Sequence, residues 1–293
     1  ARQLGWRVIL RIEDLDGPRL KPGADQLAID VMAWLGLDWD GDPVYQSADL
    51  TPYRDALQRL RTQDDIYPCD ATRKQIEAAL SAPNEGDHEL RYPGPRKVAE
   101  ARRASKESGT PTTVISPDAV PLLEEDRFAW RLRVPDDAID FQDTLQGPQS
   151  VNVQQHVGDF VVATKAGLPA YQLAVVVDDA RQGVTHVVRG DDLLPSTARQ
   201  VLLYDRLGLS DQRPTYTHLP LVYGEDGRRL AKRHGDTRLS AYQERGVPRE
   251  RIIGLLAYYA GVLQHPEPMS PGDFTAALDR DRLNTQPICF TQK

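Results

Sequence analysis

Apolar and polar residues alternate along several short stretches of the chain, which is the period of a β-strand with one buried face. Val8, Leu10 and Ile12 fall on one side of such a stretch, and Pro18 closes it. A short apolar run bounded by glycines also indicates a strand. The sequence therefore predicts strands at residues 7–14, 128–134 and 183–190, a strand or extended segment at residues 218–223, and a hairpin within residues 140–151 that turns at Gly147 and Pro148.

Elsewhere the apolar residues recur every three to four positions, which predicts helices with one buried face. Gly36 ends the first of them, and Thr51 with Pro52 has the capping residue and first-turn proline of a helix start. The predicted helices cover residues 22–35, a segment from residue 51, residues 73–80 and a segment opened by Pro248. Their predicted buried residues are Leu27, Val31, Trp34 and Leu35 in the first, Tyr53, Ala56, Leu57 and Leu60 in the second, and Ile252, Ile253, Leu256, Tyr259, Ala260 and Leu263 in the last.

Residues 158–209 are the stretch richest in apolar residues, and they also contain polar side chains at the ends of predicted elements. Arg189 stands at the end of a predicted strand, where ligand groups gather in open α/β sheets. Ser196 and Thr197 then open a helix, and we expect their hydroxyls to cap it. Residues 171–179 fit either a short buried strand or one face of a helix. The strand–turn–helix pattern around Arg189 indicates an α/β fold.

Residues 81–125 differ from the rest of the chain in composition. They are rich in proline, glycine, serine, threonine and charge, and they show little periodicity. We expect an insertion with a mobile or loosely folded tract.

Size and composition narrow the classes of protein. A chain of 293 residues can hold a full core and more than one domain, and 40% hydrophobic with 27% charged residues is typical of a soluble globular protein. No apolar run has membrane-spanning length, and no secretory signal is visible. Two cysteines are too few for a disulfide framework, which fits a cytoplasmic protein. A net charge of −7 argues against a nucleic-acid binder that uses its whole surface, but not against a local basic strip.

Two charged clusters are candidate ligand sites. Glu13, Asp14 and Asp16 end the first predicted strand, and they fit a ligand role or a solvated strand end equally well. Residues 228–235 form the most basic loop, which fits a polyphosphate clamp or a solvated loop. The histidines lack metal-ligand spacing, and Cys69 reads as a lone thiol. Walker-type loops and G-x-S-x-G elbows are absent, which excludes those nucleotide and hydrolase sites.

Several stretches in fixed order resemble the class I glutamyl-tRNA synthetases. They are residues 11–16, 35–41, 171–179 and 183–190, followed by residues 229–233, which resemble the second class I signature, K-M-S-K-S. The resemblance covers roughly residues 7–263. It points to the shorter glutamyl-queuosine tRNA(Asp) synthetase group, because residues 236–293 are too few for a large anticodon-binding region, and because residues 22–24 and 195–200 resemble that group.

The resemblance implies a Rossmann-type class I catalytic domain with an inserted subdomain and a short helical C-terminal region. It also implies that residues 171–179 are helical. The implied parts are residues 1–66, the N-terminal part of the catalytic domain; 67–157, an inserted acceptor-end-like subdomain with a flexible tract; 158–212, the second half of the catalytic domain; and 213–293, the basic loop and the helical C-terminal region.

The implied reaction is ATP-dependent activation of glutamate, followed by transfer of the glutamyl group to queuosine in the anticodon of tRNA(Asp). Such adenylation needs positioning and charge stabilisation rather than a nucleophilic side chain. By motif position, Glu13 pairs with the α-ammonium of glutamate, Tyr171 hydrogen-bonds the substrate, and Arg189 holds its side-chain carboxylate. Lys232 contacts the ATP phosphates and is the predicted catalytic residue. ATP with Mg²⁺, glutamate and tRNA(Asp) are the implied partners of a monomer without a membrane partner.

Two departures from the family pattern carry expectations of their own. The first class I signature, H-I-G-H, precedes Arg7 in the family and is absent here, so we expect the 293-residue chain alone to be poorly stable and unable to form glutamyl-adenylate. The family group binds zinc through C-x-C, a tyrosine and a further cysteine. Only Cys69 and Tyr92 match, because Ala71 and Pro95-Arg96 supply no thiolate, so we expect no zinc.

Three other functions fit the same residues. A truncated glutamyl-tRNA synthetase would charge tRNA(Glu), a non-catalytic paralogue would only bind ligand, and an adenylating enzyme could use another acceptor. The coding sequence upstream of Ala1 would separate them, since a strand followed by H-x-G-H there would indicate an enzyme.

Overall fold

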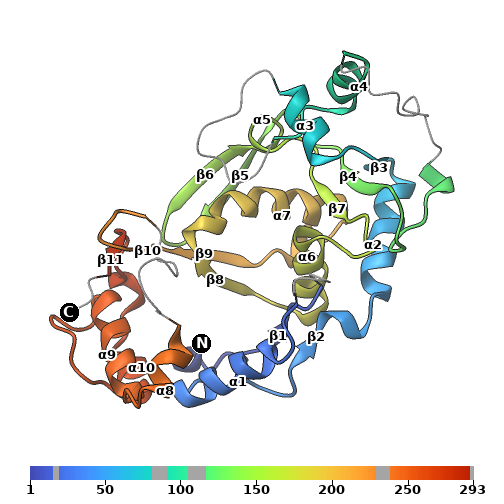
Figure 1. Cartoon of the computed structure of the whole chain (residues 1–293). Helices are drawn as coiled ribbons and strands as arrows, with labels where there is room; N and C mark the ends of the chain where they lie inside the picture. The colour runs from blue at the N-terminus through green and yellow to red at the C-terminus, as the bar shows by residue number, and fades with distance from the viewer. Residues whose placement is uncertain (16–19, 81–90, 105–116, 229–237, 291–293) are drawn as a thin grey trace. The chain divides into compact units, whose positions relative to one another are not determined.

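The computed structural model describes residues 1–15, 20–80, 91–104, 117–228 and 238–290, which fall into two compact units (Figure 1). The first unit contains residues 1–46, 190–192 and 219–293, and the second contains residues 47–189 and 193–218. Each unit is therefore assembled from segments that are far apart in the sequence. The four-part division implied by the resemblance stays a prediction.

The first unit is mainly helical. Its helices are α1 (Ala24–Leu35), α8 (Leu239–Glu244), α9 (Arg249–Tyr259) and α10 (Pro271–Ala277), and its strands form two parallel pairs, β1 (Arg11–Ile12) with β2 (Val44–Tyr45) and β10 (Val222–Tyr223) with β11 (Ile288–Cys289). Leu35, Ile252 and Ile253 form the buried core between α1 and α9. Burial of such side chains is what holds these short helices together, because each is too short to be stable alone.

The second unit contains two sheets. The three-stranded antiparallel sheet has the order β3 (Ile66–Cys69), β4 (Ala129–Leu132), β7 (Val161–Ala163). The four-stranded sheet has the order β6 (Gly147–Asn152), β5 (Ala138–Asp143), β9 (Thr215–Leu219), β8 (His186–Gly190), with β5 and β9 parallel. Because β5 and β9 are parallel neighbours, Asp143 at the end of β5 lies beside His218 near the end of β9.

The helices of the second unit pack on these sheets and on one another. They are α2 (Thr51–Thr62), α3 (Arg73–Ala79), α4 (Pro95–Ala104), α5 (Val153–His156), α6 (Tyr171–Gln182) and α7 (Leu194–Arg206). Across both units, the described residues include 3-10 helices at Arg2–Leu4, Gln46–Ala48, Pro117–Ala119, Asp191–Leu193, Ser210–Gln212 and Arg280–Arg282. α6 packs against α2 and α7, and residues 172–179 of α6 are all buried. A helix buried all round loses its 3.6-residue pattern, which explains why residues 171–179 also fitted a strand.

Most predicted helices and strands are confirmed within a few residues, but three details are wrong. The strand predicted at residues 7–14 is only β1, although Leu10 O still accepts the Val44 N–H at 2.9 Å. Leu27 is 48% exposed rather than buried, and Leu256 is 44% exposed. Their helices bury a narrower stripe than the sequence pattern predicts, centred on Leu35 in α1 and on Ile252 and Ile253 in α9.

The predicted hairpin exists, but its turn lies earlier. β5 ends at Asp143 and β6 begins at Gly147, so the turn comprises residues 144–146. Asp143 Oδ1 accepts the backbone N–H of Leu145 at 3.0 Å and of Gln146 at 2.8 Å, which is the turn chemistry of an aspartate. Pro148 is tolerated because β6 is an edge strand of the sheet.

The tract predicted to be loosely folded contains a helix. α4 occupies residues 95–104, and Val98 buries its side chain against a cluster around Tyr92. The prediction is wrong for this part. One buried valine is too few to produce a helical repeat of apolar residues in the sequence. Residues 81–90 and 105–116 lie outside the described residues. In the described part of the chain, no helix has the length and apolar character needed to cross a bilayer.

Candidate active site

Arg189 lies at the end of β8, as the sequence predicts, and three contacts hold its guanidinium. Nε donates to His218 Nε2 at 2.9 Å, and Nη2 donates to Thr197 Oγ1 at 2.8 Å and to the Leu193 carbonyl at 3.4 Å. Nη1 makes no hydrogen bond to any residue that the structure describes. The guanidinium is thus fixed by two of its nitrogens, and the third remains available to a ligand.

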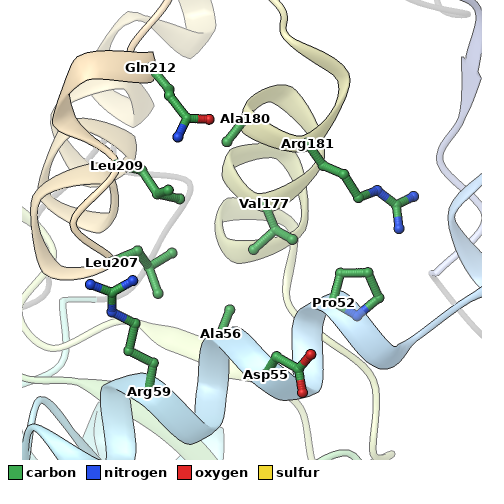
Figure 2. Close-up of a pocket in the computed structure, with 10 residues that line it drawn as sticks. All are labelled: Pro52, Asp55, Ala56, Arg59, Val177, Ala180, Arg181, Leu207, Leu209 and Gln212. Atoms are coloured by element: carbon green, nitrogen blue, oxygen red, sulfur yellow. The ribbon is translucent and has the colours of Figure 1, made fainter.

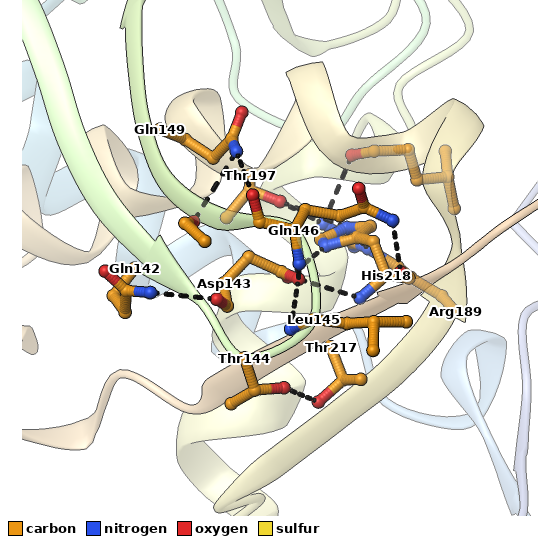
Figure 3. A network of polar contacts seen from close by, with 12 residues as sticks. Gln142, Asp143, Thr144, Leu145, Gln146, Gln149, Arg189, Thr197, Thr217 and His218 are labelled. Atoms are coloured by element: carbon orange, nitrogen blue, oxygen red, sulfur yellow. Dashed lines mark hydrogen bonds and ion pairs between the residues drawn. The ribbon is translucent and has the colours of Figure 1, made fainter. Parts of the chain in front are cut away.

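His218 connects Arg189 to Asp143, and Figure 3 shows the chain of contacts. His218 Nδ1 lies 2.6 Å from Asp143 Oδ2, and both side chains are fully buried. Because Arg189 Nε can only donate, His218 Nε2 must accept, so the ring proton sits on Nδ1 and is donated to the carboxylate. The Asp143 carboxylate therefore sets the His218 tautomer whose Nε2 accepts the hydrogen bond from Arg189 Nε.

Asp143 is saturated with donors. Its Oδ1 accepts the backbone N–H groups of Leu145, Gln146 and His218 at 3.0, 2.8 and 3.3 Å. Burial alone would raise the pKa of this carboxyl, but the hydrogen bonds from Gln146, from the His218 ring and from the other backbone groups outweigh it and hold the pKa below its usual value. The carboxylate is kept charged by its surroundings.

The lowered pKa of Asp143 predicts an acid limit to stability. A group whose folded pKa is depressed stabilises the fold above its unfolded pKa, about 3.9, and loses that contribution as the pH falls through the folded pKa. We expect the difference in unfolding free energy between the wild type and Asp143→Asn to be constant from pH 7 to about pH 4 and to narrow below it. Urea unfolding across this range measures it, and a difference that does not change with pH would contradict the assignment.

Tyr171 begins α6 and is 42% exposed. Burial raises the pKa of Tyr216 on β9. The positive charge of Arg189 opposes this rise, and Tyr171 adds to it. The Arg189 guanidinium also lies 5.4 Å from the Tyr216 ring centroid. Tyr171, Arg189 and Tyr216 all belong to the second unit.

A cavity of about 460 Å³ opens beside Tyr171. It lies between β4, β7 and the first turns of α6 and α7, and it is lined by Arg131, Val157, Phe160, Val161, Thr164, Ala170, Tyr171, Gln172, Leu193, Ser196 and Arg199. Leu193 also accepts a hydrogen bond from Arg189, so the cavity adjoins the Arg189 network. Its volume is in the range of small-molecule sites.

The other two predicted site residues belong to the first unit or lie outside the described chain. Glu13 follows β1 in the first unit, and its carboxylate lies 3.5 Å from Arg11 Nη2. Lys232 falls in residues 229–237, outside the described residues, together with nearly all of the basic loop. Asp16 of the acidic cluster also lies outside them. The roles of Glu13 and Lys232 remain predictions.

The hydroxyls at the start of α7 do not cap it as predicted. The helix begins after Leu193 without a side-chain cap, Thr197 Oγ1 accepts from Arg189, and Ser196 Oγ accepts from Arg199 at 3.0 Å. α2 likewise begins after Leu50 with no side-chain cap from Thr51. In both helices the predicted capping residues lie inside the helix, past the N-cap position, so their hydroxyls are not placed to cap the first turn.

Sequence reasoning missed His218 and Asp143. A signal was present for His218, because β9 alternates between exposed and buried residues and places His218 on the same buried face as Tyr216. A buried histidine requires a partner, so its position pointed to a polar contact. No local signal identified Asp143 as that partner, since it lies 75 positions earlier in the chain.

The two matching zinc positions lie together in the structure. Cys69 Sγ is 3.5 Å from Tyr92 Oη, and both residues are buried in a cluster with Tyr67, Ile76 and Val98. The Arg131 guanidinium lies 3.9 Å from the Tyr92 ring centroid, which places a cation where zinc would need anions. Among the residues with described positions, no three His, Cys, Asp or Glu side chains gather around a point. This donor set does not fit four-coordinate zinc.

We therefore expect purified protein to contain much less than one zinc per chain. Elemental analysis after purification without added metal measures this, with the same protein dialysed against excess zinc as the control. A stoichiometric zinc that is lost on Cys69→Ser substitution would contradict the prediction.

A second cavity of about 360 Å³ lies between α2, α6 and the segment after α7 (Figure 2). It is mostly apolar, and its Arg181 is paired with Asp49 and Asp178 at 3.6 and 3.8 Å. None of the predicted site residues lines it. The candidate site is therefore the Arg189 network and the cavity beside Tyr171.

Comparison with known proteins identifies the family. The catalytic domain of class I tRNA synthetases (E and Q) matches residues 1–267. A glutamyl-Q tRNA(Asp) synthetase of Rhodopirellula baltica is 46% identical over 267 residues, which cover 89% of this chain and 77% of that protein. The enzyme of the same name from Symbiobacterium thermophilum is 43% identical, with 98% and 87% covered.

Solved structures agree with the sequence relatives. A glutamate tRNA ligase from Elizabethkingia meningosepticum, crystallised with its amino acid, matches with a TM-score of 0.72 and 25% identity. The match covers 98% of this chain and 61% of that ligase, so the chain spans less than two thirds of its length. The fold and the resemblance predicted from the sequence are confirmed. The chain belongs to the class I tRNA synthetase family for glutamate and glutamine, with the α/β catalytic-domain fold of that family and with glutamyl-Q tRNA(Asp) synthetases as its relatives.

Proposed function

We propose that this protein activates glutamate with ATP and transfers the glutamyl group to queuosine in tRNA(Asp). The observation that carries the proposal is the guanidinium of Arg189, fixed at Nε and Nη2 with Nη1 left for a ligand. A planar guanidinium held in this way suits a carboxylate, for which lysine would be a poorer partner. The name shared by the relatives at 46% and 43% identity supports the acceptor.

The reaction has two steps. A carboxylate oxygen of glutamate attacks the α-phosphorus of ATP and displaces pyrophosphate, and a hydroxyl of the acceptor nucleoside then attacks the acyl carbon and releases AMP. Arg189 would hold the side-chain carboxylate, so that only the α-carboxylate reaches the phosphorus. Tyr171 would hydrogen-bond the substrate, and Glu13 would pair with its α-ammonium. These roles are positional, as in-line phosphoryl chemistry requires.

The remaining parts of the proposal rest on the family. Lys232 would contact the ATP phosphates and is the proposed catalytic residue, and Mg²⁺ would accompany ATP and neutralise developing charge. We also propose a monomer that works in the cytoplasm.

Two assays test the proposal, each run on the 293-residue chain and on a chain that also carries the upstream segment with H-I-G-H. Glutamate-dependent exchange of pyrophosphate into ATP reports the first step, and transfer of labelled glutamate to tRNA(Asp) reports the second. Queuosine-containing tRNA(Asp) should accept glutamate, whereas tRNA(Asp) with guanosine at the same position and tRNA(Glu) should not. Charging of tRNA(Glu) would favour a glutamyl-tRNA synthetase instead, and absence of both steps in the presence of glutamate binding would favour a non-catalytic binder.

A further inference from the structure

We infer that the cavity beside Tyr171 binds a phosphate group of the acceptor RNA through Arg131 and Arg199. This inference rests on the proposed function and extends it from the amino acid to the RNA. The cavity has a volume of about 460 Å³ and is lined by two arginines and, among the described residues, by no aspartate or glutamate. It is therefore a positively charged site in a protein whose net charge is −7.

Arg131 is held in place without a carboxylate partner in the described part of the chain. Its Nη1 donates to the Asp159 carbonyl at 2.6 Å, and its guanidinium lies 3.9 Å from the centroid of the Tyr92 ring. Its Nε is buried and has no hydrogen-bond partner among these residues. A ligand in the cavity cannot reach this buried atom, whereas Nη2 makes no hydrogen bond to a described residue and is not buried, so it is the donor left for an anion.

The pairing of β4 with β7 is irregular beside Arg131. β4 and β7 change register between Trp130 and Arg131, so the ladder is irregular at this residue. Such irregularities re-aim side chains and are common next to ligand sites. Gly158 helps to fix the neighbourhood, because its φ is +73° and an added Cβ would lie 2.2 Å from the Tyr92 carbonyl oxygen.

Arg199 is placed by a buried polar cluster between α6 and α7. Only 8% of Arg199 is exposed, and its Nη2 donates to Ser196 Oγ, which also accepts from Gln172 at 3.2 Å. Gln200 in turn donates to Gln172 at 3.0 Å. These contacts fix a second guanidinium in the wall of the same cavity.

Two helices also begin at this cavity. Ala170 and Tyr171 mark the start of α6, and Leu193 that of α7; neither helix has a side-chain cap. Helix N-termini favour anions through their backbone N–H groups and their dipoles. Two such termini and two arginines around one cavity are the chemistry of a phosphate site.

The position of the cavity selects RNA as the source of the phosphate. Tyr171 lines the cavity and is the residue proposed to bind glutamate. The acceptor hydroxyl must reach the activated glutamate, so the phosphates next to the acceptor nucleoside must lie close to this region. The side chains of Val157, Phe160 and Val161 form an apolar part of the cavity lining, against which a ribose or base can pack.

Salt-dependent binding tests the inference. The probe is the anticodon stem–loop RNA of tRNA(Asp) with queuosine, and its dissociation constant for the protein is measured by fluorescence anisotropy over a salt series. We expect Arg131→Gln and Arg199→Gln each to weaken binding about tenfold and to lower the slope of log K against log salt by about 0.7–0.9, the loss of one phosphate contact. Arg131→Lys should keep the slope, because it keeps the charge.

The control is Arg96→Gln, which removes a surface guanidinium whose side chain is 91% exposed and should leave the slope unchanged. Thermal unfolding identifies any variant that has lost its fold. Because Arg131 and Arg199 lie on different elements, the test still holds if only one of the two glutamine variants folds. Folded Gln variants with the wild-type slope would overturn the inference. Pyrophosphate exchange by the wild-type protein reports the proposed function separately, so exchange with an unchanged slope would refute the phosphate site alone.

Discussion

Replacing Arg189 by leucine should sharply reduce glutamate activation. The substrate carboxylate would face Thr197 and His218 without a cation, and truncating one partner of a buried charge pair costs about 2–5 kcal/mol. This corresponds to a fall of about 30-fold to several thousand-fold in kcat/KM for glutamate. Glutamate-dependent pyrophosphate exchange measures the loss, with the upstream H-I-G-H segment present in both the wild type and the variant.

Two variants make the Arg189 result specific. Arg189→Lys keeps the charge but loses the planar fork and the Nε bond to His218, so we expect an intermediate loss. Arg73→Leu removes an exposed guanidinium from the i,i+4 pair with Glu77 and should leave exchange unchanged. Exchange that survives in Arg189→Leu would remove Arg189 from the glutamate site.

The second large effect is expected from Asp143→Asn. The asparagine oxygen can still accept the backbone N–H groups, but its amide N–H₂ would face the N–H at His218 Nδ1. If the imidazole moves its proton to Nε2, that N–H then faces the Nε–H of Arg189 instead. Either way a buried pair of donors is left without an acceptor, which costs about 1–3 kcal/mol.

Two readouts separate this role from a purely structural one. We expect the free energy of unfolding to fall and the KM for glutamate to rise about tenfold, with a much smaller change in the KM for ATP, because only Arg189 is released. Asp140→Asn, an exposed residue of the same strand β5, is the matched control. Equal increases in both KM values would show that Asp143 supports the fold and does not position Arg189.

The local pattern of the sequence was enough to predict the amphipathic helices and the position of Arg189 at the end of a strand. α2 buries Tyr53, Leu57 and Leu60 as predicted, because side chains three and four residues apart share one helix face in any fold. The position of Arg189 could also be predicted, because the glycines that bound its strand are close to it in the sequence.

The contacts that turn Arg189 into a site were decided by the tertiary structure. Asp143 and His218 are 75 positions apart, and they meet only because β5 and β9 are neighbours in one sheet. The hydroxyl of Thr197 looked like a helix cap and instead binds Arg189, because a charged donor from β8 lies within reach. Arg131 and Arg199 face one cavity from different elements, and no spacing along the chain indicates that pairing. Hydrogen bonds between distant segments depend on which strands pair and which helices pack, and those choices are made by the whole chain at once.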